Sequence, residues 1–558
     1  MEERVWHRSY DDGVPSSLDY AQLTLPAILQ RSAERFPGAT AVVFKNARLT
    51  YAQFLAEVKA FAAGLAGLGV KRGTRVAIQL PNLPQTPIAY YAALWLGAEV
   101  VMTNPLYTPR ELEHQWSDSG CELAVVADFL FDQKIAAARS SLAPKTYVIA
   151  SIPEYLRFPL NLLAPLKLKK ADPPLYAKVP PGPGLHRFKD VVKSGRGQSP
   201  ALAAELDDVA ALQYTGGTTG LSKGAVLTHR NLSVNVQQID GWFTGVQHGD
   251  EAVLCALPIF HVFGMTVAMN WGVWAGAKLV LMPNPRDLPE LVKLITKERV
   301  TLFPGVPAMF NGLCNQPGID QVDVSSVKYC FSGSAPIPVE VIQRFEKLTG
   351  AIIVEGFGMS ESSPVTHVNP LLGERKIGSV GVPFPDTDAR VVDMEEGVRE
   401  MPLGEEGELV MRGPQVMRGY WQRERETEAT LRDGWLHTGD LAVQDEDGYF
   451  SIVGRKKDMI IAGGYNIYPD EVDRVLMAHE EILEAATIGI PDERRGETVK
   501  SYVVLQPGSS MDAAAVEAWC RENLAAYKVP RQIAFLDELP KSSTLKILRR
   551  ELRDMDAQ

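Results

Sequence analysis

Cysteine is scarce in this sequence and is never closely paired. The five cysteines are spread along 558 residues, and none stands in a Cys-x-x-Cys arrangement. Their odd number and their spacing predict neither a structural zinc site nor a framework of disulfide bonds. Unpaired thiols are typical of proteins in a reducing compartment, so we expect a cytoplasmic protein.

Long apolar runs and an excess of positive charge are also missing. No stretch of about 18 apolar residues occurs, and Met1–Trp6 lacks the apolar core of a secretory signal. The formal net charge is −11, whereas a protein that binds nucleic acid needs a basic face. These absences predict that the chain neither spans a membrane nor binds nucleic acid.

What the sequence does contain is an alternation of apolar runs of strand and helix length. Candidate buried strands such as 75–80 and 123–127 are separated by helical patterns, which predicts an α/β fold with a mostly parallel sheet. From 381 to 455, short strands between turn residues predict a small antiparallel, barrel-like β subdomain. The remaining residues have α+β texture. We therefore expect a large domain at 1–455 and a smaller, mobile C-terminal domain at 456–558.

A proline-rich segment from residue 152 to about residue 200 interrupts this alternation. Its apolar piece, 160–166, is followed by a basic cluster at 167–170 and is too short to span a bilayer. Two interpretations stay open. The segment is either a surface excursion between subdomains or a peripheral membrane contact, because apolar residues beside a basic cluster suit an anionic interface.

The strongest chemical signal is a loop from Tyr214 to Gly224 that is rich in glycine and hydroxyl side chains. Glycines let backbone N–H groups converge on an anion, while hydroxyls and an ammonium add donors and charge. The loop differs from a Walker loop, because its lysine does not lead through Ser or Thr into a helix. The residues that we expect to hold phosphate are Thr215, Gly216, Gly217, Thr218, Thr219, Gly220 and Lys223.

This loop resembles the signature of the adenylate-forming (acyl-activating, AMP-binding) enzymes. That family includes acyl-CoA synthetases, peptide-synthetase adenylation domains and firefly luciferase. Other segments that resemble family motifs follow in the family's order, so the resemblance covers about residues 25 to 550. The strand and turn at 331–336 resembles the segment near the adenine and the acyl substrate. The resemblance places Gly333, Ser334 and Ala335 there.

A second motif, from Glu355 to Ser362, resembles the family's Tyr-Gly-x-Thr-Glu segment. Phe357 replaces the usual tyrosine and Ser360 replaces the usual threonine. An aromatic ring can stack on adenine, and a carboxylate is a hard oxygen ligand that suits Mg²⁺, so the resemblance implies that Glu361 binds this metal. The other residues that it assigns to the ATP or AMP site are Glu355, Gly356, Phe357, Gly358, Met359 and Ser360.

Further motifs surround the expected domain boundary. Asp440 stands in a Thr-Gly-Asp motif and is implied to accept hydrogen bonds from the ribose hydroxyls, with Arg455 as an additional ribose or phosphate contact. Lys457 matches the position at which the C-terminal domain of the family rotates. Gly463 and Gly464 follow in a loop that, in the family, helps to form the thioester-forming site.

His261 matches the family's histidine near the acyl pocket and is also assigned to the acyl and CoA site with Gly333. Two interpretations stay open for His261: it gates the entrance for the carboxylate, or it is an ordinary histidine of the core.

Near the C-terminus, the sequence resembles the family pattern Pro-Lys-x-x-x-Gly-Lys-Ile-x-Arg. Lys546 matches the catalytic lysine, but Leu545 stands where glycine is usual. If this position requires a positive φ, leucine costs roughly 1–2 kcal/mol there. We therefore expect Leu545 to slow adenylation more than thioester formation.

The resemblance implies a reaction in two steps. A carboxylate attacks the α-phosphorus of ATP to give an acyl-adenylate and pyrophosphate, and the thiol of coenzyme A then attacks the activated carbonyl. Positioning and charge neutralisation are implied to come from Lys546, from Mg²⁺ on Glu361 and from the loop that begins at Thr215. The proline-rich segment and the Glu355–Ser362 motif are most similar to bacterial long-chain fatty-acid–CoA ligases. Fatty acid, ATP and coenzyme A are thus the expected partners.

Several alternatives stay open. The substrate is alternatively a medium-chain or aryl acid, or Leu545 leaves a protein that binds acyl-nucleotides but is impaired in adenylation. An adenylation domain that loads a carrier protein shares these motifs, but no carrier domain follows in this sequence. A luciferase-type oxygenase also shares the fold. A homodimer and a peripheral position at the inner membrane surface are further expectations.

Overall fold

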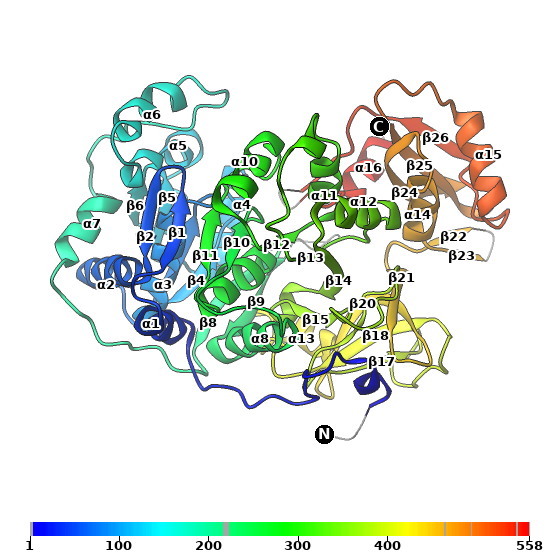
Figure 1. The fold of residues 1–558 in the computed structure, drawn as a ribbon, viewed down its shortest axis with the longest axis horizontal. Coiled ribbons are helices and arrows are strands. Elements are labelled where there is room, and N and C mark those ends of the chain that lie inside the picture. Colours follow the sequence, from blue (N-terminus) through cyan, green and yellow to red (C-terminus); the bar gives the residue numbers. More distant parts are fainter. Residues whose placement is uncertain (1–3, 216–221, 463–464, 493, 543–544, 557–558) are drawn as a thin grey trace.

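The computed structural model describes residues 4–215, 222–462, 465–492, 494–542 and 545–556. Within these residues the strands form two large sheets and two smaller ones. Figure 1 shows the two large sheets toward the left and centre, the third sheet at the lower right and the C-terminal sheet at the upper right. This mixed α/β architecture confirms the predicted fold class.

The first large sheet has seven strands and is mainly parallel. Val76 and Ile78 pack into the core that includes residues of both large sheets, whereas Ala77 packs into a separate core on the opposite face. Both faces are covered, which explains why these strands are continuous apolar runs in the sequence. The strand order is β7 (Leu185–Arg187), β6 (Thr146–Ala150), β5 (Leu123–Ala127), β3 (Arg75–Gln79), β4 (Glu99–Met102), β8 (Val209–Thr215) and β9 (Lys223–Thr228).

The second large sheet has nine strands, and its central pairs are also parallel. At one edge β2 pairs with β1 in antiparallel fashion through a tight turn at Lys45, whose φ is 54°. The apolar pattern did not predict β2. The strand order is β16 (Val382–Pro383), β15 (Val365–Val368), β14 (Ile352–Gly358), β13 (Tyr329–Ser332), β12 (Leu302–Gly305), β10 (Ala252–Cys255), β11 (Lys278–Leu281), β1 (Thr40–Phe44) and β2 (Ala47–Thr50).

Helices cover the outer faces of both large sheets and fill the space between them (Figure 1). Helix α8 begins after Thr228, whose side chain accepts a hydrogen bond from the backbone N–H of Asn231 and so caps the start of the helix. These helices include α1 (Leu25–Arg35), α2 (Tyr51–Gly67), α3 (Gln85–Trp95), α4 (Pro109–Ser119), α5 (Asp128–Leu130), α7 (Phe188–Gly195), α8 (His229–Trp242), α9 (Trp271–Trp274), α10 (Leu288–Glu298), α11 (Pro307–Cys314) and α12 (Val339–Thr349).

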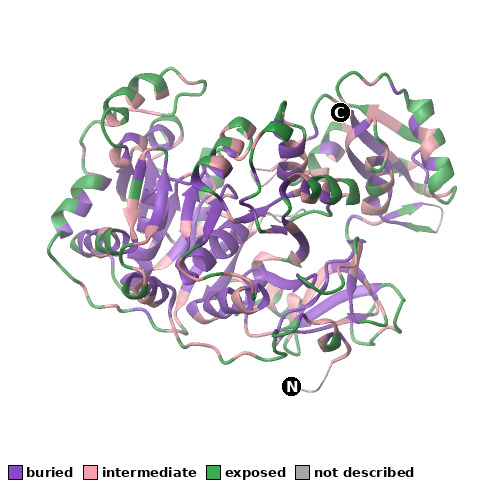
Figure 2. Cartoon of the chain, viewed as in Figure 1, coloured by how far each residue is buried: buried purple, intermediate pink, exposed green. Residues whose placement is uncertain are grey.

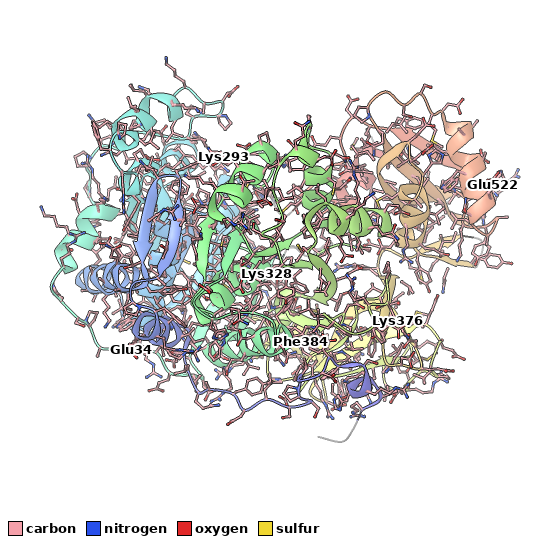
Figure 3. All side chains as sticks on the ribbon, viewed as in Figure 1. Glu34, Lys293, Lys328, Lys376, Phe384 and Glu522 are labelled. Carbon is pink, nitrogen blue, oxygen red and sulfur yellow. The ribbon has the colours of Figure 1, made fainter. Side chains whose placement is uncertain are left out.

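The third sheet is antiparallel and occupies the region where short strands were predicted. Its strands are β17 (Asp388–Val392), β18 (Gly407–Arg412), β20 (Trp435–Gln444), β19 (Leu431–Arg432) and β21 (Phe450–Arg455). An ion-pair cluster joins the β20–β21 turn of this sheet to the segment before β16. Lys376, labelled in Figure 3, lies 2.6 Å from Asp445 and 2.7 Å from Asp447. In the connection from β16 to β17, the ring of Phe384, also labelled there, lies 5.3 Å from that of Trp242 in α8, centroid to centroid.

The C-terminal sheet carries its own helices and its own apolar cores. The strands are β23 (Tyr465–Ile467), β22 (Ile460–Ala462), β25 (Gly496–Leu505), β24 (Ile482–Asp492) and β26 (Gln532–Phe535), and the helices are α14 (Pro469–Met477), α15 (Ala513–Asn523) and α16 (Arg549–Asp556). A separate core is what a part that can move as a unit requires.

The first described residues form a strap across the β-rich part of the molecule. Arg4 makes an ion pair of 2.7 Å with Asp388, and the hydroxyl of Tyr10 donates to the carbonyl of Pro383. The carboxylate of Asp11 accepts backbone hydrogen bonds from residues 371–373. The start of the chain is therefore fixed to segments that follow it by more than 350 positions.

The proline-rich segment forms a short helix, α6 (Leu160–Leu168), and then returns to add β7 to the seven-stranded sheet. No residue of α6 is buried, and Figure 2 shows the helix in exposed and intermediate colours at the edge of the molecule. Among the described residues, no helix is both long enough and apolar enough to cross a membrane.

Candidate active site

The predicted phosphate loop connects two paired strands. Thr215, at the end of β8, lies opposite Lys223, at the start of β9. The Lys223 ammonium is 5.3 Å from the ring centroid of Tyr420 and 4.0 Å from a carboxylate oxygen of Glu426. The loop residues Gly216, Gly217, Thr218, Thr219 and Gly220 lie outside the described part of the chain, so their expected role stays a prediction.

Glu361 lies in a short 3-10 helix, Ser360–Ser362, which follows β14. Its side chain is buried, and the hydroxyl of Tyr420 donates to Oε1 at 2.7 Å. Burial raises the pKa of Glu361, while this hydrogen bond and the charge of Arg455 oppose the increase. Tyr420 therefore links the carboxylate of Glu361 to the lysine of the phosphate loop.

The surroundings of Glu361 fit Mg²⁺. This ion usually takes one or two protein carboxylates and completes its coordination with water and substrate phosphates. The hydrogen bond from Tyr420 uses Oε1 of Glu361, which leaves Oε2 as a second hard oxygen. Among the described residues there is no group of three or more His, Cys, Asp or Glu that could form a cage made of protein ligands alone.

Asp440 and Arg455 face each other across two antiparallel strands, β20 and β21. Arg455 Nε lies 2.9 Å from Asp440 Oδ1. The second oxygen, Oδ2, is buried and has no hydrogen-bond partner among the described residues. Burial raises the pKa of Asp440, and the charges of Arg455 and Lys546 oppose this. A buried acceptor without a partner is costly, so Oδ2 is an acceptor available for a ligand hydroxyl.

Lys546 extends from the C-terminal part toward this ion pair. Its backbone is held in a tight loop in which Ser542 N–H donates to the Lys546 carbonyl at 2.8 Å. The residue is solvent-exposed, but its ammonium lies among protein charges. The positive charge of Arg455, followed by desolvation, lowers the pKa of Lys546 to about 8. The charges of Asp440 and Asp470 oppose this shift.

Leu545 precedes this lysine and adopts a left-handed conformation, with φ at 61°. This confirms the condition on which its expected strain depends. The side chain is partly buried and packs against the core of the two large sheets, although the residue belongs to the C-terminal part. Leu545 is therefore a contact between the two parts of the chain in this arrangement.

Lys457 lies in the turn that follows β21, close to the same charges. Burial and the charge of Arg455 lower the pKa of its ammonium, and Asp440 and Glu361 act in the opposite direction. Just before this turn, a Cβ added to Gly454 would lie 3.2 Å from the ring of Tyr468. Gly463 and Gly464, the predicted thioester-loop glycines, lie outside the described residues.

The acyl side of the predicted site is built around β13 and the segment at His261. A Cβ on Gly333 would lie 3.2 Å from the ring of Phe263, and the following Ser334 has a φ of 72°. His261 Nδ1 accepts the backbone N–H of Phe263. Burial and the charge of Lys546 lower the pKa of His261 to about 4, which makes the ring neutral at physiological pH. His261 thus lies near Lys546 as a neutral side chain.

Two residues of the adenine motif have different surroundings. Phe357 is partly buried, and its ring lies 6.0 Å from that of His367 on the paired strand β15. Glu355 is buried, and this burial raises its pKa to about 8, so it is mostly protonated at neutral pH. A neutral carboxyl group can donate a hydrogen bond as well as accept one.

Residues from motifs that are far apart in the sequence lie close together in one site, where their charges and contacts interact. Sequence analysis missed Tyr420 and also Asp118, whose carboxylate accepts the hydroxyl of Tyr214 at 2.7 Å. Tyr420 stands beside Trp421 after Gly419, and such a pair of aromatics next to a glycine is the signal that could have drawn attention to it. The predicted residues that the structure brings together are Glu361, Asp440, Arg455, Lys457, Lys546 and His261.

Comparisons with known proteins give the class to which this arrangement belongs. Residues 29–421 match the AMP-binding enzyme family, and residues 471–546 match the AMP-binding enzyme C-terminal domain. The chain belongs to the AMP-binding enzyme family.

Relatives include two proteins named long-chain-fatty-acid–CoA ligase. One, from Bacillus subtilis (strain 168), is 44% identical over 100% of this chain and 99% of its own length. Another, from Salmonella typhimurium, is 40% identical over 99% of this chain and 98% of its own length. The solved structure of an anthranilate CoA ligase in complex with anthranoyl-AMP has a TM-score of 0.86 at 27% identity, over 97% of this chain and 98% of that one.

Proposed function

We propose that this protein is an AMP-forming ligase that joins a long-chain fatty acid to coenzyme A. The observation that carries the proposal is the convergence of Lys546 on Asp440 and Arg455, beside a buried Asp440 oxygen that has no hydrogen-bond partner within the described part of the chain. Family membership and the names of the relatives at 40% and 44% identity support the same activity. ATP and coenzyme A are the co-substrates.

In the first step, a carboxylate attacks the α-phosphorus of ATP and pyrophosphate leaves. Asp440 Oδ2 would accept a ribose hydroxyl, and Lys546 would neutralise charge that develops on the phosphates. Thr215 and Lys223 would hold the phosphates on the opposite side. Mg²⁺ held by Glu361 would supply additional positive charge to the phosphates. The side chains provide positioning and charge, and no covalent enzyme intermediate is needed.

In the second step, the thiol of coenzyme A attacks the acyl-adenylate carbonyl and AMP leaves. We propose that residues 456–558 form a lid that rotates about Lys457, which withdraws Lys546 and moves Gly463 and Gly464 toward the acyl group. The large domain would then be 1–455, with the β subdomain at about 381–455. The separate core of the C-terminal part supports rotation as a unit.

A thioester assay with acids of graded length tests this function. Purified protein with ATP, Mg²⁺ and coenzyme A should release AMP and pyrophosphate and form an acyl-CoA, with the highest kcat/KM for long-chain acids. A maximum for medium-chain or aryl acids would support the alternative substrate class. Failure to form an acyl-adenylate from any acid would support a nucleotide-binding protein without turnover.

Other expectations remain proposals about how the enzyme works. We propose that it acts in the cytoplasm, where ATP and coenzyme A are supplied, and that a homodimer is one arrangement to test by light scattering. Peripheral contact with the inner membrane surface would involve the exposed helix α6.

A further inference from the structure

Helix α6 and the residues before it form an exposed patch that is both apolar and basic. Phe158 is 77% exposed, Leu162 64% and Leu166 67%, and these large side chains follow one another within nine positions. We call this surface the α6 patch; its members are Arg157, Phe158, Leu160, Leu162, Leu163, Leu166, Lys167, Lys169 and Lys170. Exposed apolar side chains are normal when scattered singly, but a concentrated group marks an interaction site.

Hydrogen bonds and packing fix the backbone of the α6 patch to the rest of the protein. The backbone N–H and carbonyl of Arg157 form hydrogen bonds of 3.0 Å with the side chain of Asn46, in the β1–β2 turn. After the helix, Leu175 N–H donates to the Leu168 carbonyl, and the carbonyl of Pro174 accepts a hydrogen bond from Gln133. Ala164 packs against the main core. A fixed support presents the outer side chains with little loss of freedom on binding.

The charges of the patch select its partner. Lys167, Lys169 and Lys170 are exposed, and none makes a salt bridge within the described part of the chain. The whole protein has a net charge of −11, so this basic cluster opposes the general charge of the surface. Apolar side chains beside unpaired lysines fit the boundary between the acyl chains and the anionic headgroups of a bilayer.

A second copy of the chain is a poorer occupant. In a two-fold interface the same patch meets itself, so lysines from both subunits would be brought together with like charges. A bilayer instead accepts leucine and phenylalanine side chains among the lipids and offers negative charge to the lysines. Figure 1 shows α6 at the upper left and the C-terminal part at the upper right, so the two are well separated along the long axis.

We propose that the α6 patch docks the protein reversibly on an anionic lipid surface, with α6 lying in the plane of the interface. The helix has nine residues and does not cross the bilayer. This inference rests on the exposed residues and not on the proposed fatty-acid substrate. Vesicle binding needs no ATP, coenzyme A or acid, so its failure and the failure of the ligase function can be told apart.

Vesicle flotation of the full chain tests the proposal. Wild-type protein should float with phosphatidylcholine vesicles that contain phosphatidylglycerol, float less with phosphatidylcholine alone, and be released by high salt. The triple variant Lys167→Glu, Lys169→Glu, Lys170→Glu should partition at least about a hundredfold more weakly. The double variant Leu162→Asp, Leu166→Asp should lose binding to a similar degree.

The matched control is Leu403→Asp, which places the same charge at a side chain that is 53% exposed in another part of the molecule. It should bind vesicles like wild type. Unchanged melting temperatures and unchanged activity on a dispersed acid show that the variants are folded. Wild-type protein that stays with the unbound fraction, or α6 variants that float like wild type, would overturn the proposal. So would a dimer in light scattering that Leu162→Asp, Leu166→Asp dissociates without any loss of flotation.

Discussion

Lys546 carries a charge whose state depends on pH near neutrality. The neighbouring Arg455 lowers its pKa to about 8, so the ammonium of the free enzyme loses its proton as pH rises through this value. In the absence of coenzyme A, kcat/KM for ATP in pyrophosphate release should therefore fall above about pH 8. Lys546→Arg keeps its charge to a much higher pH and should be slower but lack this alkaline decline. An identical decline in Lys546→Arg would assign the titration to another group.

Leu545 combines backbone strain with a contact between the two parts of the chain. Its positive φ belongs to a loop closed by local hydrogen bonds, so under the proposed rotation the strain would remain within the loop. Its contact with the core of the large sheets exists in this arrangement. We propose that the acyl-adenylate forms in this arrangement, so we expect the contact to favour that step, whereas the sequence-based expectation was that Leu545 slows it.

Leu545→Gly should thus slow acyl-adenylate formation by about fivefold and not slow thioester formation from supplied acyl-adenylate. Single-turnover rates of each half-reaction show whether Leu545 speeds or slows acyl-adenylate formation. Leu545→Asn tolerates the left-handed conformation without the apolar contact and should behave like glycine. Leu545→Met keeps an apolar side chain and should resemble wild type. Faster adenylation by the glycine variant would instead support the sequence-based expectation.

At the scale of elements, α4 connects the phosphate-loop strands to the segment that carries Tyr420. Asp118, near the end of α4, accepts the Tyr214 hydroxyl at 2.7 Å and pairs with Arg423. Its backbone carbonyl accepts Trp421 Nε1–H at 3.1 Å, and Trp421 N–H in turn donates to the Gly224 carbonyl. One carboxylate therefore holds both sides of the region that we expect to bind phosphate.

Asp118→Ala should lower the apparent melting temperature, because removing one partner of a mostly buried pair costs about 3 kcal/mol. KM for ATP should also rise, since Tyr420 and the loop strands lose a common support. The control is Asp323→Ala, which breaks an ion pair with Arg299 in which both side chains are about two-thirds exposed and should cost under about 1 kcal/mol. Equal melting shifts for the two variants would contradict the prediction.

Sequence patterns predicted the elements better than the contacts between them. Buried parallel strands such as β3 and β5 are continuous apolar runs, which local pattern reveals. The glycine that is usual at position 545 raised the question of a positive φ, and the φ of Leu545 is indeed positive. The four-residue strand β2 was missed because it is short and only partly buried. The bond between Tyr420 and Glu361 could not be predicted, because nothing local to a tyrosine indicates which carboxylate, 59 positions away, it will meet.

At the scale of the whole molecule, Gly454 lies where the large part and the C-terminal part touch. Its missing side chain gives room for the ring of Tyr468 in this arrangement. Gly454→Val should therefore push the C-terminal part away and reduce acyl-adenylate formation by about tenfold or more, since overpacking costs about 1–3 kcal/mol. Thioester formation from supplied acyl-adenylate should change less, if rotation separates the two residues.

Gly67→Ala is a suitable control for this variant, because a Cβ at Gly67 would have no neighbour within 4 Å among the residues that the structure describes. Half-reaction rates of both variants would be compared with those of wild type. Equal losses in both half-reactions of Gly454→Val would show that the substitution damages the fold instead of the arrangement.

The strap formed by the first described residues has a consequence for synthesis on the ribosome. Residues 4–11 emerge from the ribosome long before their partners at Pro383 and Asp388, which lie more than 370 positions further along the chain. During this time the strap residues lack these partners, while the intervening sheets form. These residues are Arg4, Tyr10 and Asp11. Closure of the strap is thus a late event, and a nascent chain released before about residue 390 would carry an unattached leading segment.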